Sequence, residues 1–393
     1  MDGNRRAYPR IYYEMLTINI FTFLGMNLVG SFLPILAKDL DPTESLIGVV
    51  VSAWFLPRIF IELPSGFLSD RIGRPRLYVL GLFLGVIGTI LCAIAPSIHI
   101  LILGRAIWGF GMAFYFLNNT ALLFDLFQLT ERGRAIGTFQ GISNLGGLIA
   151  GPIGGFLAGF LGYYSVFIAS FILACSTVIV ALTSTKLNAI REKRDSQLSQ
   201  RSITVALLSL PRWPIFVVCT INLIRMMVMN GVMSTVFQLH LHDNLGFNLG
   251  LSGIVVGLRT VGFSVSTFLS GYLSLKVSRK TIIIFGLALE ALGLFSYTLV
   301  QSFPLVLLIG FVSTLGGGFT WNALTVLLSN LVQSESRGIA LGLYRTFMDI
   351  GGTLGPIVMM SIAIPFGLQV PFTVGAALLF VMVALTFTLK LNR

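Results

Sequence analysis

The run LTINIFTFLGMNLVGSFLPILA, residues 16–37, has no charged side chain and is long enough to cross a membrane, since a spanning helix needs about 20 mostly apolar residues. Similar runs follow one another to the C-terminus. Of the 393 residues, 55% are hydrophobic and 10% are charged, whereas roughly 25% are charged in an average soluble domain. No small-residue cleavage site follows the first run, so we interpret it as a membrane helix and not a signal peptide. The sequence therefore predicts an all-α integral membrane protein.

Basic residues gather in alternate loops. The chain has 26 Lys and Arg and a formal charge of +11. One set of loops carries most of the basic side chains between the apolar runs: Arg71, Arg74, Arg76, Arg132, Arg134, Lys276, Arg279 and Lys280. In the other set Lys38 is the single basic residue. This pattern predicts a multi-pass protein of the cell (plasma) membrane with both termini in the cytoplasm. We expect membrane lipids as partners and no nucleic acid, because no soluble domain remains to form such a surface.

The apolar runs predict twelve transmembrane helices. We place them near residues 15–37, 45–69, 77–95, 99–125, 134–160, 163–185, 213–239, 249–273, 281–300, 304–330, 338–363 and 369–389. Residues 186–212 are polar and basic, which is typical of a solvated linker. We therefore expect an N-terminal six-helix bundle over residues 1–185, a cytoplasmic linker over 186–212, and a C-terminal six-helix bundle over 213–393.

The two predicted bundles resemble each other in sequence. An offset of 205 relates Ser65-Gly66-Phe67-Leu68-Ser69 to Ser270-Gly271-Tyr272-Leu273-Ser274, and Arg132-Gly133 to Arg337-Gly338. One deleted residue brings Gly147-xxx-Gly151-Pro152 onto Gly351-xxx-Gly355-Pro356. Such repeats predict two pseudo-symmetric halves with the substrate path between them.

A loop motif carries a family resemblance. The segment Gly66-Phe67-Leu68-Ser69-Asp70-Arg71-Ile72-Gly73-Arg74, between the second and third helices, resembles the G-x-L-x-D-R-x-G-R signature of the major facilitator superfamily. The resemblance implies that this loop latches one conformation against the start of the eleventh helix, around residues 337–342. Gly73 permits a tight turn, and Asp125 could join Arg74 in a charge cluster. We assign the latch to Gly66, Asp70, Arg71, Gly73, Arg74 and Asp125.

Two further motifs resemble drug/proton antiporters of the twelve-helix type. Leu101-xxx-Arg105-xx-Trp108-Gly109-Phe110-Gly111 is similar to the family's second motif, with Trp108 in place of Gln, and implies proton coupling at Arg105. A structural donor to backbone carbonyls is the alternative. Gly147-xxx-Gly151-Pro152-xx-Gly155 resembles the antiporter motif, although close packing alone would also explain it. We expect helix packing and bending at Gly147, Gly151, Pro152, Gly155, Gly351, Gly355 and Pro356.

Charged residues within the apolar runs are candidates for function, because a charge at this depth costs about 2.5–3.5 kcal/mol on the insertion scale. Besides Arg105 they are Arg58, Glu62, Arg225, Arg259, Glu290, Arg345 and Asp349. The pairs Arg58 with Glu62 and Arg345 with Asp349 are spaced i,i+4, so each can lie on one helix face. They are either structural pairs or proton carriers, and we name Glu62 and Asp349 with Arg105 as proton-coupling residues.

The resemblance implies that the first, fourth, seventh and tenth helices line a central cavity. Methionines, aromatic rings and amides there would suit varied lipophilic or cationic solutes, while packing against helices or lipid is the alternative. Our candidate substrate-binding residues are Asn27, Asn119, Asn222, Arg225, Met226, Met229, Trp321 and Asn322.

The leading functional hypothesis is a secondary transporter that works by alternating access and exports small lipophilic or cationic compounds in exchange for protons. The main alternative is uptake or exchange of a small organic anion, in which Arg225 and Arg259 would face water. An intramembrane enzyme or a transporter-derived receptor is a remote alternative, since no converging catalytic residues are seen. We expect a monomer and not an enzyme.

We expect no metal and no cofactor. The three cysteines have no CxxC spacing. His240-x-His242-Asp243 is interpreted as a solvated loop. The sequence also lacks a G-xxxx-G-K-[ST] phosphate-binding loop, which makes ATP an unlikely energy source.

Overall fold

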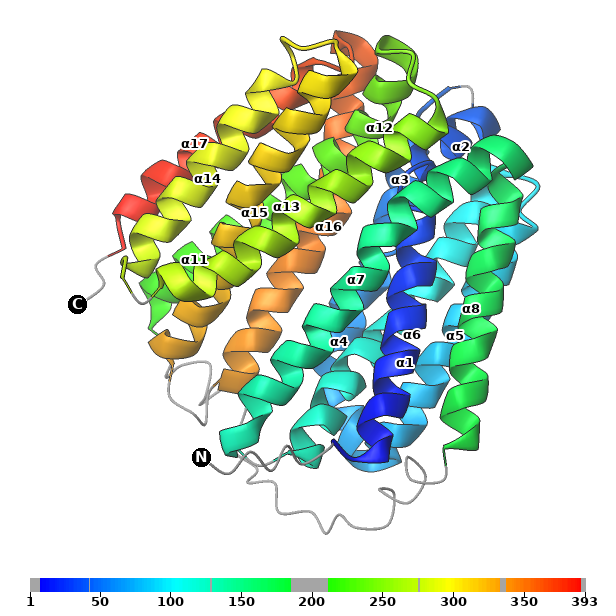
Figure 1. Ribbon diagram of the computed structural model, residues 1–393, viewed down its shortest axis with the longest axis vertical. Coiled ribbons are helices and arrows are strands. Elements are labelled where there is room, and N and C mark those ends of the chain that lie inside the picture. Colours follow the sequence, from blue (N-terminus) through cyan, green and yellow to red (C-terminus); the bar gives the residue numbers. More distant parts are fainter. Residues whose placement is uncertain are drawn as a thin grey trace.

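The computed structural model describes residues 8–41, 43–127, 129–184, 211–274, 276–332 and 337–389, and these residues form helices joined by short turns, with no strand among them. Residues 185–210, which make up most of the expected linker, lie outside this range. Both termini lie toward the same end of the molecule (Figure 1), which we call the terminal end, and the other end is called the far end.

The N-terminal half contains eight helical segments. They are α1 (Arg10–Leu28), α2 (Leu33–Leu40), α3 (Ile47–Ser52), α4 (Leu56–Ile72), α5 (Arg74–Ala93), α6 (Ile98–Leu126), α7 (Leu129–Leu161) and α8 (Tyr163–Thr183). The bend between α1 and α2 is 47°. Pro34 in the first turn of α2 accounts for the break, since proline has no N–H to donate to the carbonyl four residues earlier and its ring clashes with that carbonyl. The expected second helix is likewise divided into α3 and α4.

The C-terminal half follows the same plan. Its segments are α11 (Arg212–Val228), the π-helical η2 (Met229–Val236), α12 (Phe237–Leu239), the π-helical η3 (His240–Asn244), α13 (Leu249–Leu273), α14 (Arg279–Ser296), α15 (Phe303–Leu331), α16 (Arg337–Phe366) and α17 (Val370–Phe387). The segments from α11 to η3 follow one another directly and correspond to the single expected helix at 213–239. The π-helical turns were not predicted.

All twelve expected spans coincide with helices. Within the described residues, nine helices are long and apolar enough to cross a membrane, or ten when α1 and α2 count as one bent span. The other two spans are α3 with α4, and α14. Both carry more charge: Arg58 and Glu62 lie in α4, and Arg279, Lys280 and Glu290 in α14. Large apolar side chains such as Phe160 and Phe60 are exposed on the outside, as expected of a lipid-facing surface.

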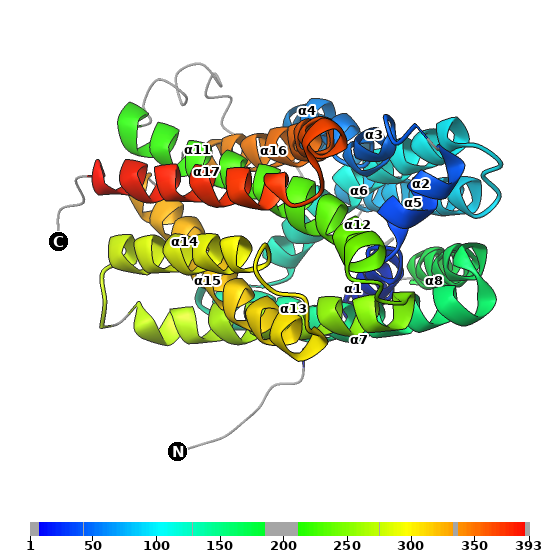
Figure 2. The same ribbon diagram turned by 90° about the horizontal axis from the view of Figure 1, so that it is seen from above.

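The helices form two groups that meet along two seams. Figure 2 shows α7 beside α13 at one edge and α16 beside α3 and α4 at the opposite edge, in agreement with the contacts between these elements. Helices α7 and α13 therefore bring the two halves together on one side, and α16 brings them together on the other.

Candidate functional site

Glycines let the backbones of the two halves touch in both seams. A Cβ on Gly48 of α3 would lie 2.5 Å from the Pro356 carbonyl oxygen of α16, and one on Gly253 of α13 would lie 2.6 Å from the Gly151 carbonyl oxygen of α7. Only glycine allows so close an approach. Gly48 and Gly253 are related by the offset of 205, so the internal repeat reappears as two equivalent contacts between the halves.

These contacts belong to the far-end parts of the helices. A Cβ on Gly155 would clash with the Leu249 carbonyl, and the Ser52 hydroxyl donates to the Thr353 carbonyl over 2.5 Å. In contrast, Gly137, nearer the terminal end of α7, has no atom of the described residues within 4 Å of where its Cβ would be. The described backbone contacts between the halves therefore lie toward the far end.

The remaining glycines of the predicted packing set have different neighbours. Side chains at Gly351 and Gly355 would meet the Leu223 and Met227 carbonyls of α11, within the C-terminal half. Gly147 lies near the Asn27 amide of α1. Helix α7 continues through Pro152, and α16 continues through Pro356, and a bending role for these prolines stays a prediction.

An ion-pair group joins the halves at the far end. The Lys38 ammonium at the end of α2 lies 2.8 Å from Asp243 in η3 and 2.8 Å from Glu44. Asp243 also contacts the imidazole of His242 at 2.9 Å. The segment around His240 differs from the predicted solvated loop, because it is helical and His240 itself is buried against the Phe372 ring.

A second charge cluster joins the halves deeper in the molecule. The Arg58 guanidinium of α4 donates to Glu62 Oε1 over 3.1 Å, and its Nε lies 3.1 Å from Asp349 Oδ1 of α16. Asp349 is fully buried, and neither of its carboxylate oxygens accepts a hydrogen bond within the described part of the chain. The Arg58 guanidinium carbon lies 4.5 Å from the centre of the Trp54 ring. A buried ion pair thus connects the two halves.

The partner of Asp349 differs from the one predicted. The pair of Arg58 with Glu62 is confirmed, but Asp349, which the i,i+4 spacing assigned to Arg345, pairs with Arg58 in the other half. Arg345 remains close enough to interact electrostatically with Asp349, Arg58 and Glu62. Sequence spacing describes neighbours on one helix, and only the packing of α4 on α16 brings Arg58 to Asp349.

The candidate cavity residues on α11 occupy two environments. Arg225 is 1% exposed and donates to Glu290 of α14 at 3.0 Å and to the Gly317 carbonyl at 2.9 Å. Asn222, also buried, donates to the Tyr344 carbonyl. Met226 and Met229 are half-buried, the latter in the π-helical η2. Hence Arg225 and Asn222 are held inside the C-terminal half, while the two methionines retain accessible surface.

The other candidates from the sequence are spread over both halves. Asn27 is exposed and Asn119 is buried with no partner for its Oδ1. Trp321 and Asn322 are half-buried, and the Asn322 amide donates to the Thr267 carbonyl. Two of these side chains belong to the N-terminal half and two to the C-terminal half.

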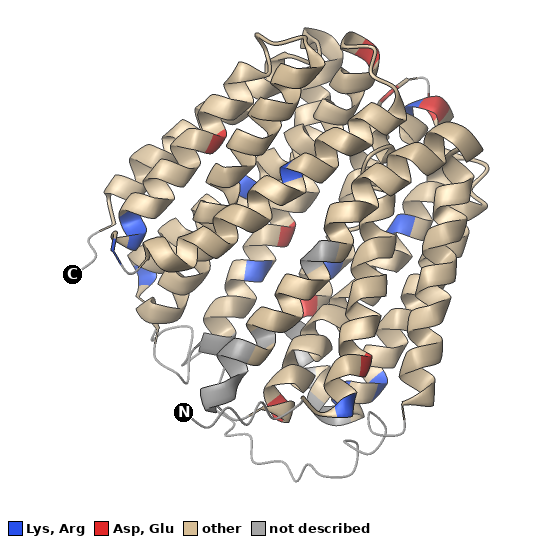
Figure 3. Ribbon diagram, in the orientation of Figure 1, with Lys and Arg blue, Asp and Glu red and all other residues tan. Residues whose placement is uncertain are grey.

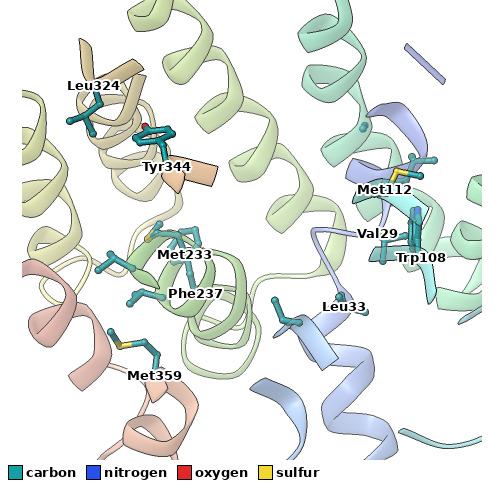
Figure 4. Close-up of a cluster of buried hydrophobic side chains, with 14 of the residues drawn as sticks. Val29, Leu33, Trp108, Met112, Met233, Phe237, Leu324, Tyr344 and Met359 are labelled. Carbon is teal, nitrogen blue, oxygen red and sulfur yellow. The ribbon is translucent and has the colours of Figure 1, made fainter. Parts of the chain in front are cut away.

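A small pocket inside the N-terminal half was missed by sequence reasoning. Helices α1, α5, α6 and α8 surround it, and its lining includes Phe21, Met26, Trp108, Met112 and Ser170. Figure 4 shows Trp108 and Met112 side by side, and Met233, Phe237 and Met359 in the other half. Methionine and aromatic residues at adjacent turns of α6 were the available signal.

Arg105 is an almost buried arginine without an ion pair among the described residues. Its guanidinium lies 5.4 Å from the centre of the Trp108 ring, and its Nε has no hydrogen-bond partner. The Trp that replaces the family's Gln thus contacts the arginine through its ring face.

The predicted latch is described only in part. Gly73 has a φ of +96° between α4 and α5, which confirms the tight turn. Arg74 donates to Asp125 at 2.6 Å, which confirms the predicted pairing. The burial of Gly66, the side chains of Asp70 and Arg71, and the side chains of residues 337–338 at the start of α16 lie outside the described set, and the latch therefore stays a prediction.

The charges inside the molecule have no metal-binding arrangement among the described residues, where no group of three His, Cys, Asp or Glu converges. Figure 3 shows that several charged residues lie at mid-height and the others toward the two ends. An ion pair between the halves can break if the halves separate, and its carboxylate can then take up a proton.

Comparison with known proteins gives consistent matches over the whole chain. A family profile described as Major Facilitator Superfamily matches residues 15–233 and 218–393. Quinolone resistance protein NorA of Staphylococcus aureus (strain MSSA476) is 25% identical over 348 residues, 88% of each chain. Multidrug resistance protein 2 of Bacillus subtilis (strain 168) is 26% identical over 385 residues, 96% of this chain and 95% of that protein.

Solved structures share the fold. A bacterial homolog of the human lysosomal transporter Spinster, in an inward-facing and unoccupied conformation, aligns with a TM-score of 0.77 at 16% identity over 98% of this chain and 97% of that one. The nucleoside transporter NupG aligns with a TM-score of 0.78 at 17% identity over 96% and 100%.

Proposed function

The chain belongs to the Major Facilitator Superfamily and is a membrane transporter, not an enzyme, and on that premise we propose that it exports small lipophilic or cationic compounds in exchange for protons. The names of the relatives, a quinolone resistance protein and a multidrug resistance protein, support drug-like substrates. The single observation that carries proton coupling is the buried ion pair between Arg58 and Asp349, which crosses the interface between the halves.

The proposal assigns the terminal end to the cytoplasm, as the loop charges predict. The far-end seams then face outward, and the described state is closed to the outside. In this state Asp349 is a carboxylate paired with Arg58. Rocking that opens the outer side must separate α4 from α16 and break that pair, since its two members belong to different halves.

Proton exchange then follows from the pair. When the outer side opens, Asp349 loses Arg58, becomes accessible and takes a proton from outside. The carrier then closes at the outer side with this side chain neutral and releases the proton to the cytoplasm. Re-formation of the ion pair holds the carrier open inward until substrate binds. Without that hold, the empty carrier would cycle and dissipate the proton gradient.

Other residues support the cycle in the proposal. Glu62 shares Arg58 with Asp349 and is a second proton acceptor. Arg105 supplies a positive charge in the N-terminal half. Substrate contacts come from the half-buried Met226, Met229 and Trp321, since thioethers and ring faces adapt to varied apolar and cationic compounds.

The experiment is dye uptake by proteoliposomes with an acid interior, comparing the wild type with Asp349→Asn and Arg105→Ala. Transporter molecules inserted inside out exchange protons from the vesicle interior for external cationic dye, so the dye accumulates inside the vesicle. We expect Asp349→Asn to abolish this accumulation. The control is Glu14→Gln, because Glu14 pairs with Arg10 near the terminal end of α1, away from the interface. Accumulation by Asp349→Asn at the wild-type level would refute proton coupling through this residue.

The same vesicles separate export from uptake of an anion. If a carboxylate anion accumulates and no cationic dye moves, and if Arg225→Ala removes the anion uptake, the protein is an anion carrier and the export proposal fails.

A further inference from the structure

Among the described residues, Arg225, Arg259 and Glu290 form a buried group in the C-terminal half with two positive charges and one negative charge. Arg225 and Glu290 form one ion pair at 3.0 Å. Arg259 of α13 is the second cation, and the charge of Glu290 reaches it as well. Two guanidinium groups therefore share one carboxylate, which leaves one positive charge without a counterion in a medium where an unpaired charge is costly.

Both guanidinium groups also have unused donors. Arg225 Nη1 has no hydrogen-bond partner among the residues that the structure describes, although the side chain is 1% exposed. Arg259 Nε has none either, and Arg259 Nη1 reaches the Met233 carbonyl only at 3.4 Å, a long hydrogen bond. Buried donors are ordinarily satisfied, so donors left open beside an excess charge indicate a missing acceptor.

The two arginines both pack against α15, at positions two helical turns apart. A Cβ on Gly317 would lie 2.8 Å from Arg225 Nη2, and one on Gly310 would lie 3.0 Å from Arg259 Cγ and 3.1 Å from the Tyr297 hydroxyl. Gly310 and Gly317 are two turns apart, roughly 10 Å along the axis. Arg259 is the more accessible of the two at 9% exposed, so a ligand reaches it first.

The surroundings of Arg259 are suited to an amphipathic ligand. Its guanidinium lies 5.3 Å from the centre of the Phe237 ring. The Met233 carbonyl that it contacts belongs to the π-helical η2, and π-helical turns frequently occur at functional sites. An aromatic ring and a backbone carbonyl of η2 thus adjoin the unpaired charge.

We propose that Arg259, with Arg225 behind it, forms a subsite that binds an acidic group of the transported compound, a carboxylate in the simplest case. This inference rests on the proposed export function and defines its substrate class. The carrier would favour lipophilic compounds that bear a carboxylate beside their cationic part over the same compounds with the acid masked. The ligand carboxylate supplies the missing counterion and accepts from the open donor of Arg259, and Glu290 keeps its pair with Arg225.

The test uses two forms of one cationic xanthene dye, a methyl ester and the free carboxylate. Dissociation constants of both are measured by fluorescence anisotropy on the purified full chain, and export of both is measured in proteoliposomes. The readout is the ratio of carboxylate to ester affinity, which is compared between the wild type, Arg259→Gln and Arg259→Lys. Arg212→Gln is the matched control, since it removes the same charge at the exposed start of α11.

We expect Arg259→Gln to lower the ratio about tenfold, in line with the loss of a charge-assisted hydrogen bond, and Arg212→Gln to leave it unchanged. If Arg259→Gln fails to fold, Arg259→Lys decides, because it keeps the charge but loses the two-pronged contact and should lower the ratio several-fold. An unchanged ratio in the folded variants, with the ester still exported, overturns the subsite alone. If neither dye is bound or exported by the wild type, the export proposal fails and the subsite with it.

Discussion

Removing the charge of Asp349 should open the outer side of the transporter. At 3.1 Å, the Coulomb attraction between Arg58 and Asp349 is about 5 kcal/mol for an effective dielectric constant of 20. Asp349→Asn leaves Arg58 paired with Glu62, so we take the lower end of the range for breaking a buried pair, about 3 kcal/mol. The equilibrium between the outward-closed and outward-open states should therefore shift roughly 150-fold toward the open state.

Thiol labelling from outside measures this shift. Ser52 lies in the seam and is 2% exposed, so Ser52→Cys should react slowly with a membrane-impermeant maleimide while the seam is closed. The assay uses a background in which the native Cys92, Cys175 and Cys219 are replaced by serine. Adding Asp349→Asn should then raise the labelling rate by about two orders of magnitude, in proportion to the open population.

Two controls accompany the labelling. Asp349→Glu retains the charge and should label nearly as slowly as the parent. Glu14→Gln removes an acid outside the interface and should have no effect. Equal labelling rates for Asp349→Asn and its parent would show that the cross-half ion pair does not hold the seam closed, and the coupling scheme built on it would be wrong.

Three more predictions concern the seams and the latch. A short reductant-cleavable bismaleimide that links Lys38→Cys to Asp243→Cys should stop transport, because it fixes the far ends of the two halves together, and cleavage by a reductant should restore it. Transport by the cross-linked protein would contradict a required opening there. Gly155→Val should destabilise the closed seam by about 1–3 kcal/mol and lower transport at least tenfold. The control Gly137→Ala, where the added Cβ meets no described atom, should transport normally. Equal activities of the two variants would disprove the packing role of Gly155. Arg74→Gln should change thermal stability by less than about 1 kcal/mol, as expected of a partly exposed ion pair, and a larger loss in an unfolding scan would indicate that the pair does more than anchor the turn.

The helices and the family could be predicted from residue patterns. The expected span at 249–273 matches α13 at both ends, because an apolar run bounded by polar turns has one low-energy solution in lipid. The breaks were harder to predict: α1 bends before Pro34, and π-helical turns interrupt the seventh span. Local helix propensity says little about these features, because they depend on how neighbouring helices pack against the segment.

Hydropathy, loop charge and motif spacing are properties of short segments, so the residues alone were enough to predict an all-α membrane transporter with an internal repeat. Sequence spacing also placed Arg58 beside Glu62, four residues apart on one helix. The pairing of Asp349 with Arg58 of the other half, the burial of Arg225 against Glu290, and the absence of an acid paired with Arg259 among the described residues became visible in the folded molecule. The physical reason is that ion-pair energy depends on distance and burial, and both are set where helices from distant parts of the chain pack together.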